Sequence, residues 1–508
     1  MLADEKHGES KAKQGFLAPE IGITCDCFDT GQELTGDNET VTSWRVTFAS
    51  VMAEANSWSG KLVSNFGKLN VARFYGEATW ILTGQIAAAV GGIVGVPLLA
   101  HYLRPEDYGR LALGGTVAAL VQQICLGPLG AAGQRFYAAS VESNELADFL
   151  RAAGRVVFTT CAFIAVIGGL TVVALAGSRF HSSVLLAGWS LVFAILTGVS
   201  SVFDGIQTAA RQRAIVAWHQ GLGVWLRFGF AACLVRLFGG PALAMAGFAA
   251  GITVILISQV VFFRRAILSS PAYRPGLNPE RERDLRRQMW VYARPLSSWG
   301  LFTWGQIASD RWALESLTTT RAVGIYQVLY QLGYYPISMA SAFVNQLIQP
   351  ILFARAGTGT NENRVANTHR IIHMLLAASL FLSLAGFVVS AVMFKFLFRL
   401  LLPPAYGPAA HLMPFMVLSA GIFECGQIVS LKHMLSPNPR SLIAPKIATA
   451  VLGICLNFAG AYLFGLTGVV AANLCFSVVF CVWVVVVAPK VGAAYGKTAV
   501  PPAAAIDI

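Results

Sequence analysis

Long apolar runs separated by short polar segments make up most of the chain after about residue 75. Each run has about 20 or more residues, the length that a helix needs to cross a hydrocarbon core of about 30 Å. The pattern predicts about twelve membrane-spanning helices, near residues 77–102, 108–133, 149–177, 182–204, 213–238, 241–263, 293–316, 322–354, 369–394, 409–432, 441–464 and 466–489. We therefore expect an all-α polytopic membrane protein.

Composition agrees with this pattern, because 56% of the residues are hydrophobic and only 12% are charged. A soluble domain carries about 25% charged residues, so these charges are too few to cover a water-exposed surface of this size. The net charge of +12 does not indicate a nucleic-acid partner. Most basic residues lie in the short polar gaps, where Lys and Arg determine membrane topology. We expect no nucleic acid among the partners.

The distribution of Lys and Arg predicts the orientation of the chain. With the N-terminus placed inside, the inner segments carry roughly four Lys or Arg residues for each one outside. Both termini are then expected in the cytoplasm. The longest polar interruption after the first span, residues 264–292, is rich in Arg and divides the spans into two groups of six.

The predicted domain organisation follows from these divisions. Residues 1–70 are polar and contain no apolar run and no signal peptide, so we expect a disordered cytoplasmic extension. After this extension we expect four parts, which are a six-helix bundle at 71–263, a cytoplasmic loop at 264–292, a second six-helix bundle at 293–490 and a cytoplasmic tail at 491–508.

A weak internal repeat supports the division into two bundles. The first hairpin of each half closes with a related segment, LRPEDYGRLALGG at 103–115 and LTTTRAVGIYQVLY at 317–330. Related bundles with a substrate path between them are typical of transporters.

Four segments resemble the polysaccharide or O-antigen flippases of the multidrug/oligosaccharidyl-lipid/polysaccharide (MOP) exporter superfamily. They are VPLLAHYLRPEDYGRLALGG within 96–140, IASDRWALESLTTTRAVGIYQVLY at 307–330, LFRLLLPPAYGPAA at 397–410 and CLNFAGAYLFGLTGVVAANLCFS at 455–477. The resemblance covers about residues 75–505. It implies two six-helix bundles related by a pseudo-twofold axis, in a V shape like that of multidrug and toxic compound extrusion (MATE) transporters.

The same resemblance implies a function and a location. The protein is expected to move a polyprenyl-pyrophosphate-linked oligosaccharide across the bacterial cytoplasmic (inner) membrane for O-antigen, lipopolysaccharide or exopolysaccharide synthesis. Its expected partners are this lipid-linked oligosaccharide, membrane lipids and polysaccharide assembly proteins, with Na⁺ or H⁺ as a coupling ion.

Charged side chains at membrane depth are the first candidates for function, because each costs at least about 2.5–3.5 kcal/mol there. Arg227 lies midway along the fifth span and either contacts the pyrophosphate or forms a structural ion pair. Asp310 and Arg311 lie in the seventh span, where Asp310 either neutralises an arginine or binds a coupling cation. Glu424, in the tenth span, either carries a proton or Na⁺ or bridges helices.

A stripe of tyrosines is the second candidate feature. Tyr326, Tyr330 and Tyr334 recur every four residues along the eighth span, and Gln331 belongs to an adjacent stripe. Sugars stack on aromatic rings and hydrogen-bond to amides, so the stripe predicts a glycan path, with packing between helices as the equal alternative. These four residues, with Arg227 and Arg311, form the predicted substrate-binding set.

Motifs of common catalytic sites do not occur in the sequence. It has no GxxxxGK[ST] phosphate loop, no HExxH and no GxSxG. We therefore expect a transporter rather than an enzyme, without a metal or cofactor. Two other functions remain as alternatives, a cation-coupled multidrug exporter of the same superfamily and a membrane-embedded glycan polymerase or glycosyltransferase. The first is disfavoured because spans one to three lack an acidic residue at mid-depth, and the second because the outer loops are short.

Overall fold

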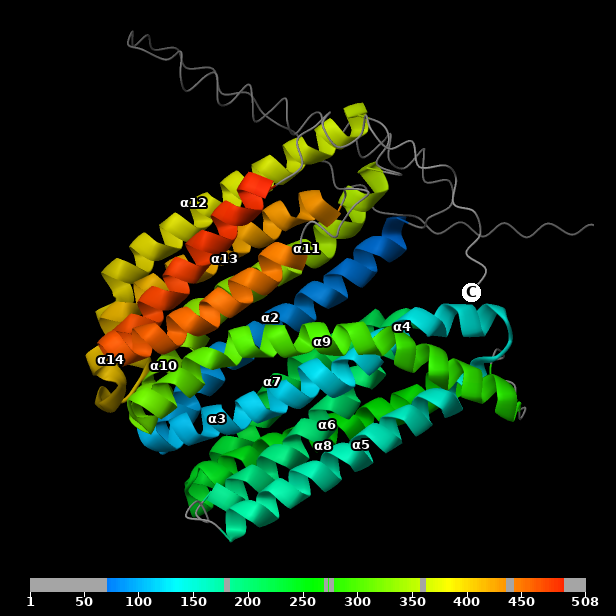
Figure 1. The fold of residues 1–508 in the computed structure, drawn as a ribbon, viewed down its shortest axis with the longest axis horizontal. Helices are drawn as coiled ribbons and strands as arrows, with labels where there is room; N and C mark the ends of the chain where they lie inside the picture. Colours follow the sequence, from blue (N-terminus) through cyan, green and yellow to red (C-terminus); the bar gives the residue numbers. More distant parts are fainter. Residues whose placement is uncertain are drawn as a thin grey trace, which may run out of the picture. The chain divides into compact units, whose positions relative to one another are not determined.

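The computed structural model describes residues 71–177, 183–268, 273, 278–356, 362–434 and 443–487, which are helical almost throughout (Figure 1). No strand occurs among these described residues. The prediction of an all-α protein is therefore confirmed. The predicted extension at 1–70 and the predicted tail at 491–508 lie outside the described residues.

The helical elements of the first half are α2 (Val71–Tyr102), α3 (Pro105–Val121), the π-helical turn η1 (Gln122–Leu126), α4 (Gly127–Glu142), α5 (Leu146–Ala176), α6 (Val184–Ala209), α7 (Arg213–Phe238), α8 (Pro241–Phe263) and the π-helical turn η3 (Arg264–Leu268). These helices pack against their neighbours in the chain, as α7 does against α8, and also against more distant helices, as α4 does against α6. Small residues bring the helices close together. A Cβ atom on Gly84 of α2, for example, would lie 2.4 Å from the carbonyl oxygen of Ala217 in α7.

The second half repeats this arrangement of long helices. Its elements are α9 (Pro279–Leu317), α10 (Thr320–Leu329), the π-helical turn η4 (Tyr330–Tyr334), α11 (Tyr335–Ala356), α12 (Glu362–Leu401), the 3₁₀ segment η5 (Pro404–Leu412), α13 (Met413–Met434) and α14 (Ile443–Val487). Since η4 joins α10 to α11 without a break, these three elements form one long helix with a wider turn in its middle.

The number of membrane spans agrees with the prediction once two features are considered. Among the described residues, nine helices are long and apolar enough to cross a membrane. The helix α9 and the α10–α11 run are long enough but more polar, and α14 contains two spans. Gly465 has a left-handed φ of 59°, and the backbones of Gly460 and Gly468 touch, so the chain reverses direction there. Together these features match the twelve predicted spans.

The helix α9 begins earlier than the apolar pattern predicts, at Pro279 within the predicted loop 264–292. The Asn278 side chain caps it by accepting a hydrogen bond of 3.1 Å from the backbone N–H of Arg281. Proline at the first helical position and two glutamates in the first turn also favour a helix start. These local signals act in a segment that is too charged to cross a membrane, so hydrophobicity alone misses them.

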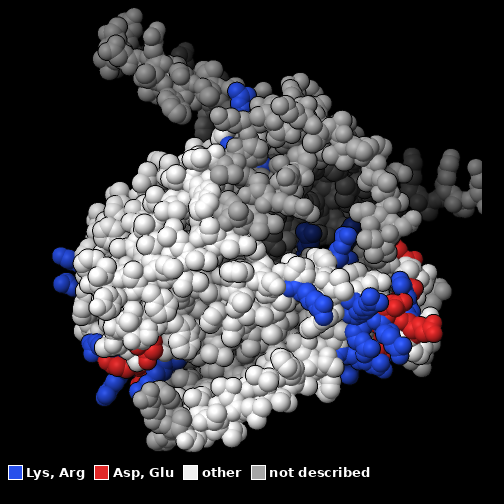
Figure 2. Space-filling view, viewed as in Figure 1, with Lys and Arg blue, Asp and Glu red and all other residues white. Residues whose placement is uncertain are grey.

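The exterior of the helical part is apolar. Large hydrophobic side chains such as Phe158, Phe381, Val392 and Phe464 are exposed. On the face drawn in Figure 2, charged residues gather over two opposite ends of the molecule, and a broad uncharged band separates them. One end carries the α4–α5 turn and the start of α9, and the other carries the starts of α3 and α10 (Figure 1). The protein is therefore a multi-pass membrane protein.

The two halves touch at the end that the topology prediction places outside. A Cβ on Gly109 of α3 would lie 2.1 Å from the carbonyl oxygen of Thr320 in α10, so the two helix backbones are in direct contact. Glu106 and Arg321 form an ion pair beside this contact, at 3.3 Å. The outer ends of α3 and α10 are therefore closed against each other.

Two tyrosines add hydrogen bonds to this closed end. The hydroxyl of Tyr108 donates to Oε1 of Gln331 at 2.7 Å, and the hydroxyl of Tyr406 donates to the carbonyl oxygen of Leu103 at 2.9 Å. Both join residues of the first half to residues of the second half. The rings of Tyr108 and Tyr406 also pack edge to face, with centroids 6.2 Å apart.

Candidate functional site

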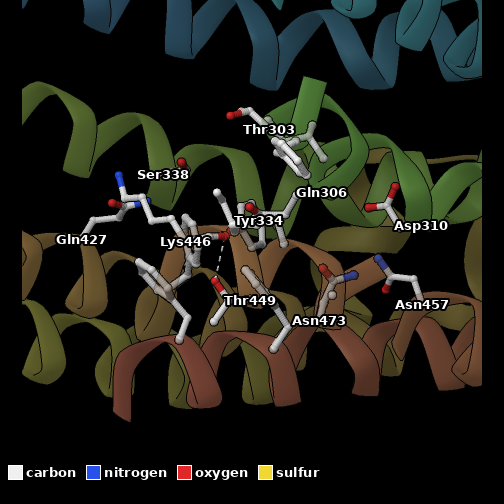
Figure 3. A pocket seen from close by; sticks show the side chains of 18 of the residues that line it. Thr303, Gln306, Asp310, Tyr334, Ser338, Gln427, Lys446, Thr449, Asn457 and Asn473 are labelled. Atoms are coloured by element: carbon white, nitrogen blue, oxygen red, sulfur yellow. Dashed lines mark hydrogen bonds between the residues drawn. The ribbon is translucent and has the colours of Figure 1, made fainter. Parts of the chain in front are cut away.

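A cavity of about 260 Å³ lies among helices of the second half. Polar and aromatic side chains from α9, η4, α11, α13 and α14 line it. Figure 3 shows Gln427 and Lys446 toward one end of the cavity and Asp310 and Asn457 toward the other. Its polar lining consists of Thr303, Gln306, Asp310, Tyr330, Tyr334, Ser338, Gln427, Lys446, Thr449, Asn457 and Asn473.

The helix α14 supplies both arms of one cavity wall. Lys446, Thr449 and Asn457 recur at intervals of three and eight residues, so they share one face of the first arm. Because the chain reverses at Gly465, the second arm returns and brings Asn473 to the same cavity. The two amides therefore face one space although a tight turn separates them in the chain.

Lys446 is the cation of this cavity. Its Nζ lies 5.3 Å from the centre of the Trp299 ring of α9, a cation–π contact. The ion pairs that the described residues form do not include it. The ammonium group is therefore available to an anion that enters the cavity.

Asp310 and Arg311 form a buried ion pair at the deeper end, with Nη1 of Arg311 2.9 Å from Oδ1 of Asp310. Nε of Arg311 also donates to Oε1 of Gln327 at 2.6 Å, and the guanidinium lies 4.4 Å from the centre of the Tyr330 ring. Arg311 does not line the cavity, whereas Asp310 does. The structural ion pair, one of the two roles predicted for Asp310, is present.

Tyr326 extends this buried network toward α14. Its hydroxyl donates to Oδ2 of Asp310 at 2.5 Å, and Nδ2 of Asn473 donates to the same hydroxyl oxygen at 2.8 Å. The ring is fully buried and does not line the cavity. Tyr326 thus connects the carboxylate to the cavity-lining amide.

The other two tyrosines of the predicted stripe do line the cavity. Tyr330 and Tyr334 stack with centroids 4.9 Å apart and planes 12° from parallel. They are the first and last residues of the π-helical turn η4, so they lie about one helical turn apart on the same side of the helix. Together they present an aromatic surface of the kind on which sugar rings stack.

Gln331 and Glu424 lie outside the cavity lining. The side chain of Gln331 accepts the hydrogen bond from Tyr108 at the closed outer end. Glu424 is buried on α13, where Ser338 donates to its Oε1 at 2.8 Å. Since Ser338 itself lines the cavity, Glu424 is one hydrogen bond away from it.

Arg227 lies on α7 in the first half and is not part of this cavity. Its Nε donates to the carbonyl oxygen of Gly223, at 3.3 Å. The ion pairs among the described residues do not include it.

Sequence reasoning missed Lys446, Asn457 and Asn473 as site residues. Lys446 lies near the inner end of a predicted span, where the sequence indicates a lysine only as a topology signal. The spacing of polar residues along one face of the first arm of α14 is a signal for Lys446 and Asn457, whereas Asn473 comes from the second arm. Within the described part of the chain, no group of three or more His, Cys, Asp and Glu side chains is placed to hold a metal ion.

Solved structures of membrane transporters share this fold. The lipid II flippase MurJ in an inward closed conformation matches with a TM-score of 0.60 and 11% identity, over 80% of this chain and 86% of that one. An inward-facing multidrug-resistance MATE transporter of the MOP superfamily matches with a TM-score of 0.59 and 12% identity, over 80% and 97%. A MATE transporter of Vibrio cholerae matches with a TM-score of 0.53 and 11% identity, over 81% and 94%.

The sequence itself matches a known family. Residues 76–356 match the family described as "Polysaccharide biosynthesis protein", which is more than half of the chain. The comparison with curated proteins found no match. The family match and the shared fold confirm the resemblance on which the sequence prediction rested. The chain belongs to the polysaccharide biosynthesis protein family and has the fold of the MOP-superfamily transporters and flippases.

Proposed function

We propose that the protein moves a polyprenyl-pyrophosphate-linked oligosaccharide across the bacterial cytoplasmic membrane for surface polysaccharide synthesis. The observation that carries the proposal is the cavity among the membrane-spanning helices, which combines a cation, stacked tyrosines and several amides. The family match and the likeness of fold to a lipid II flippase support it.

The cavity offers the groups that a glycan pyrophosphate needs. A charged head group transferred into hydrocarbon without partners would cost far more than thermal energy. Lys446 supplies an ammonium group for the pyrophosphate, and the stacked Tyr330 and Tyr334 supply a platform for sugar rings. Gln427 and Asn457 add amide donors and acceptors for hydroxyl groups. The polyprenyl chain stays in the bilayer.

Alternating access then moves the head group. The outer ends of α3 and α10 are closed by the Gly109 contact and the Glu106–Arg321 ion pair. Rocking of the two halves would open this end and close the other. With the predicted orientation, a membrane potential that is negative inside favours export of an anion by about 2.3 kcal/mol per charge per 100 mV.

Arg227 and the two carboxylates have separate roles in this proposal. Arg227, on α7 of the first half, would offer a guanidinium to the pyrophosphate when the halves move. Asp310 at the cavity and Glu424 behind Ser338 are the groups that would carry Na⁺ or H⁺ if transport is coupled to an ion gradient. The mechanism needs no covalent step.

Export of a cationic drug is the second candidate function. The observation that favours it is the carboxylate of Asp310 on the cavity wall of a protein with the fold of MATE transporters. The Asp310–Arg311 ion pair opposes it, because this carboxylate is already neutralised. Lys446 in the same cavity would also repel a cationic drug.

Translocation in proteoliposomes tests the proposal directly. Purified protein is reconstituted with a fluorescent polyprenyl-pyrophosphate oligosaccharide, and a membrane-impermeant reagent reports how much lipid reaches the other leaflet. We expect faster exchange than in protein-free liposomes, and no drug resistance in cells that express the protein. Exchange at the protein-free rate together with increased drug resistance would favour the exporter function instead.

A further inference from the structure

A second group of basic side chains lies away from the cavity, between α12 and α13. His369 and His373 are four residues apart on α12, so they share one face of that helix. Lys432 approaches them from α13, and its Nζ lies 2.6 Å from Nε2 of His373. None of the three lines the cavity.

These basic groups lack a counter-charge among the described residues. His369 is only 4% exposed, and its Nε2 has no hydrogen-bond partner among the residues that the structure describes. Lys432 is 9% exposed. The ion pairs among the described residues include none of the three side chains. A buried ammonium without an anion is costly, so this arrangement favours binding of an anion.

The position of the cluster identifies the kind of anion. The polar stretch that opens α12 ends at Arg370, where the long apolar run of this helix begins, and Lys432 follows the apolar run of α13 two residues before that helix ends. All three side chains therefore lie near the boundary between hydrocarbon and head groups. Leu352 of α11, Ile372 of α12 and Ile428 of α13 form a buried apolar cluster, and Ile372 is the chain neighbour of His373. Lysine is a frequent phosphate ligand, and basic pockets between membrane helices at this depth suit anionic lipid head groups.

We propose that His369, His373 and Lys432 form a binding site for a phosphate group at the predicted cytoplasmic surface. Lys432 supplies the charge, and Nε2 of the buried His369 is free to donate a hydrogen bond to a phosphate oxygen when it carries the proton. His373 is exposed and forms the open side of the site. The phosphate belongs either to a lipid head group or to soluble phosphate. The site does not depend on the proposed transport function.

Thermal unfolding of the purified full-length protein in detergent tests the site. The unfolding midpoint temperature is measured as one of three probes is added. The probes are phosphatidylglycerol, inorganic phosphate at constant ionic strength, and dioleoylglycerol, which carries no phosphate. We expect a saturable rise of the midpoint with a phosphate-bearing probe and none with dioleoylglycerol. The Lys432→Gln variant should need about fivefold more probe for half of the effect, the change that corresponds to about 1 kcal/mol.

Matched variants distinguish a built site from general surface charge. Arg370→Gln removes one positive charge from the exposed side of α12 next to His369 and should bind the probe as the wild type does. Lys432→Arg keeps the charge and should retain binding. If Lys432→Gln is not monodisperse by size exclusion, His373→Leu replaces it, because His373 is exposed. We expect the same fivefold weaker response to the probe in this variant.

The outcomes separate the sources of the phosphate and decide the proposal. A response to phosphatidylglycerol alone identifies a lipid head group, and a response to inorganic phosphate identifies a soluble ligand. Either response supports the proposed site if the Lys432→Gln substitution weakens that response. Equal weakening in Arg370→Gln, or no weakening in Lys432→Gln and His373→Leu, would overturn the proposal.

Discussion

Glu106 and Arg321 form an ion pair across the closed outer end and lie 215 residues apart in the chain. The touching glycines Gly109 and Gly324 have the same separation, and so do Pro105 and Thr320 beside them. Residues at equivalent positions of a repeat meet each other only where the symmetry axis passes between them. The pseudo-twofold axis of the two halves therefore runs between α3 and α10, where any rocking of the halves must change the contact.

Replacement of Gly324 by alanine should disrupt this contact. The new Cβ would lie 1.8 Å from the carbonyl oxygen of Pro105, so α3 and α10 must separate. We expect a loss of about 1–3 kcal/mol of stability and faster labelling, from outside, of a cysteine introduced at Gln331. Gly115→Ala on α3 is the matched control, since no atom lies within 4 Å of its Cβ position. Equal stability and equal labelling rates in the two variants would show that the α3–α10 contact is not close.

The Asp310–Arg311 pair should be strongly coupled. Asp310→Asn leaves the Arg311 guanidinium buried without its carboxylate, at a cost of about 3–5 kcal/mol. Arg311→Gln should be destabilising as well. The double variant should lose less stability than the two single losses together, because no unpaired charge remains in it. Thermal unfolding of the four proteins completes the cycle, and additive losses would mean that the ion pair is not coupled.

Lys446→Gln should reduce transport without changing folding. The substitution removes one charge-assisted hydrogen bond to the pyrophosphate, worth about 1.5–3 kcal/mol, so we expect a transport rate at least about tenfold lower. Lys395→Gln, at the exposed outer end of α12, should leave the rate unchanged. The proteoliposome assay measures both. A normal rate in Lys446→Gln would exclude its ammonium from substrate binding.

Arg227→Ala should abolish export of the surface polysaccharide while the protein level stays normal. The guanidinium has no ion-pair partner among the described residues, so its loss leaves no unpaired carboxylate there. Arg236→Ala, at the exposed end of the same helix, is the control. Immunoblots and surface-polysaccharide gels give the two readouts. Normal export in Arg227→Ala would remove this residue from the mechanism.

Acid should release the start of α9 from the α4–α5 turn. The Arg281 guanidinium, 2.8 Å from Glu145, holds the pKa of that carboxyl below its usual value of about 4.3. A lowered folded-state pKa gives stability that is present above the unfolded-state pKa and disappears as the pH falls through the folded-state pKa.

Hydrogen exchange of residues 279–292 measures this effect. We expect the protection to decrease below about pH 4 in the wild type. In Glu145→Gln it should already be reduced at neutral pH and change less on acidification. The Glu145 side chain is 27% exposed, so high salt should weaken the interaction as well. Unchanged protection across this pH range would show that the ion pair does not hold α9.

The sequence predicted parts of the candidate site and missed others. The stripe of Tyr330 and Tyr334 lines the cavity as a glycan path requires, but the third tyrosine, Tyr326, is buried beneath it. The hydrogen bonds of the Tyr326 hydroxyl with Asp310 and Asn473 hold this ring in the interior, and these partners are distant in the chain. Lys446 is the reverse case, because the sequence indicates it only as a topology signal but the structure places it in the cavity lining.

By itself, the sequence determined the membrane spans, their division into two related halves and the family. Hydrophobic length acts locally, because a run of about 20 apolar residues must cross the bilayer whatever its neighbours are. Only the tertiary structure decided which way each side chain faces. Arg311 turns to Gln327 and Tyr330, and Asn457 and Asn473 line one cavity although the Gly465 turn lies between them in the chain. The physical reason is that helix rotation depends on packing against partners distant in the chain, which no local pattern records.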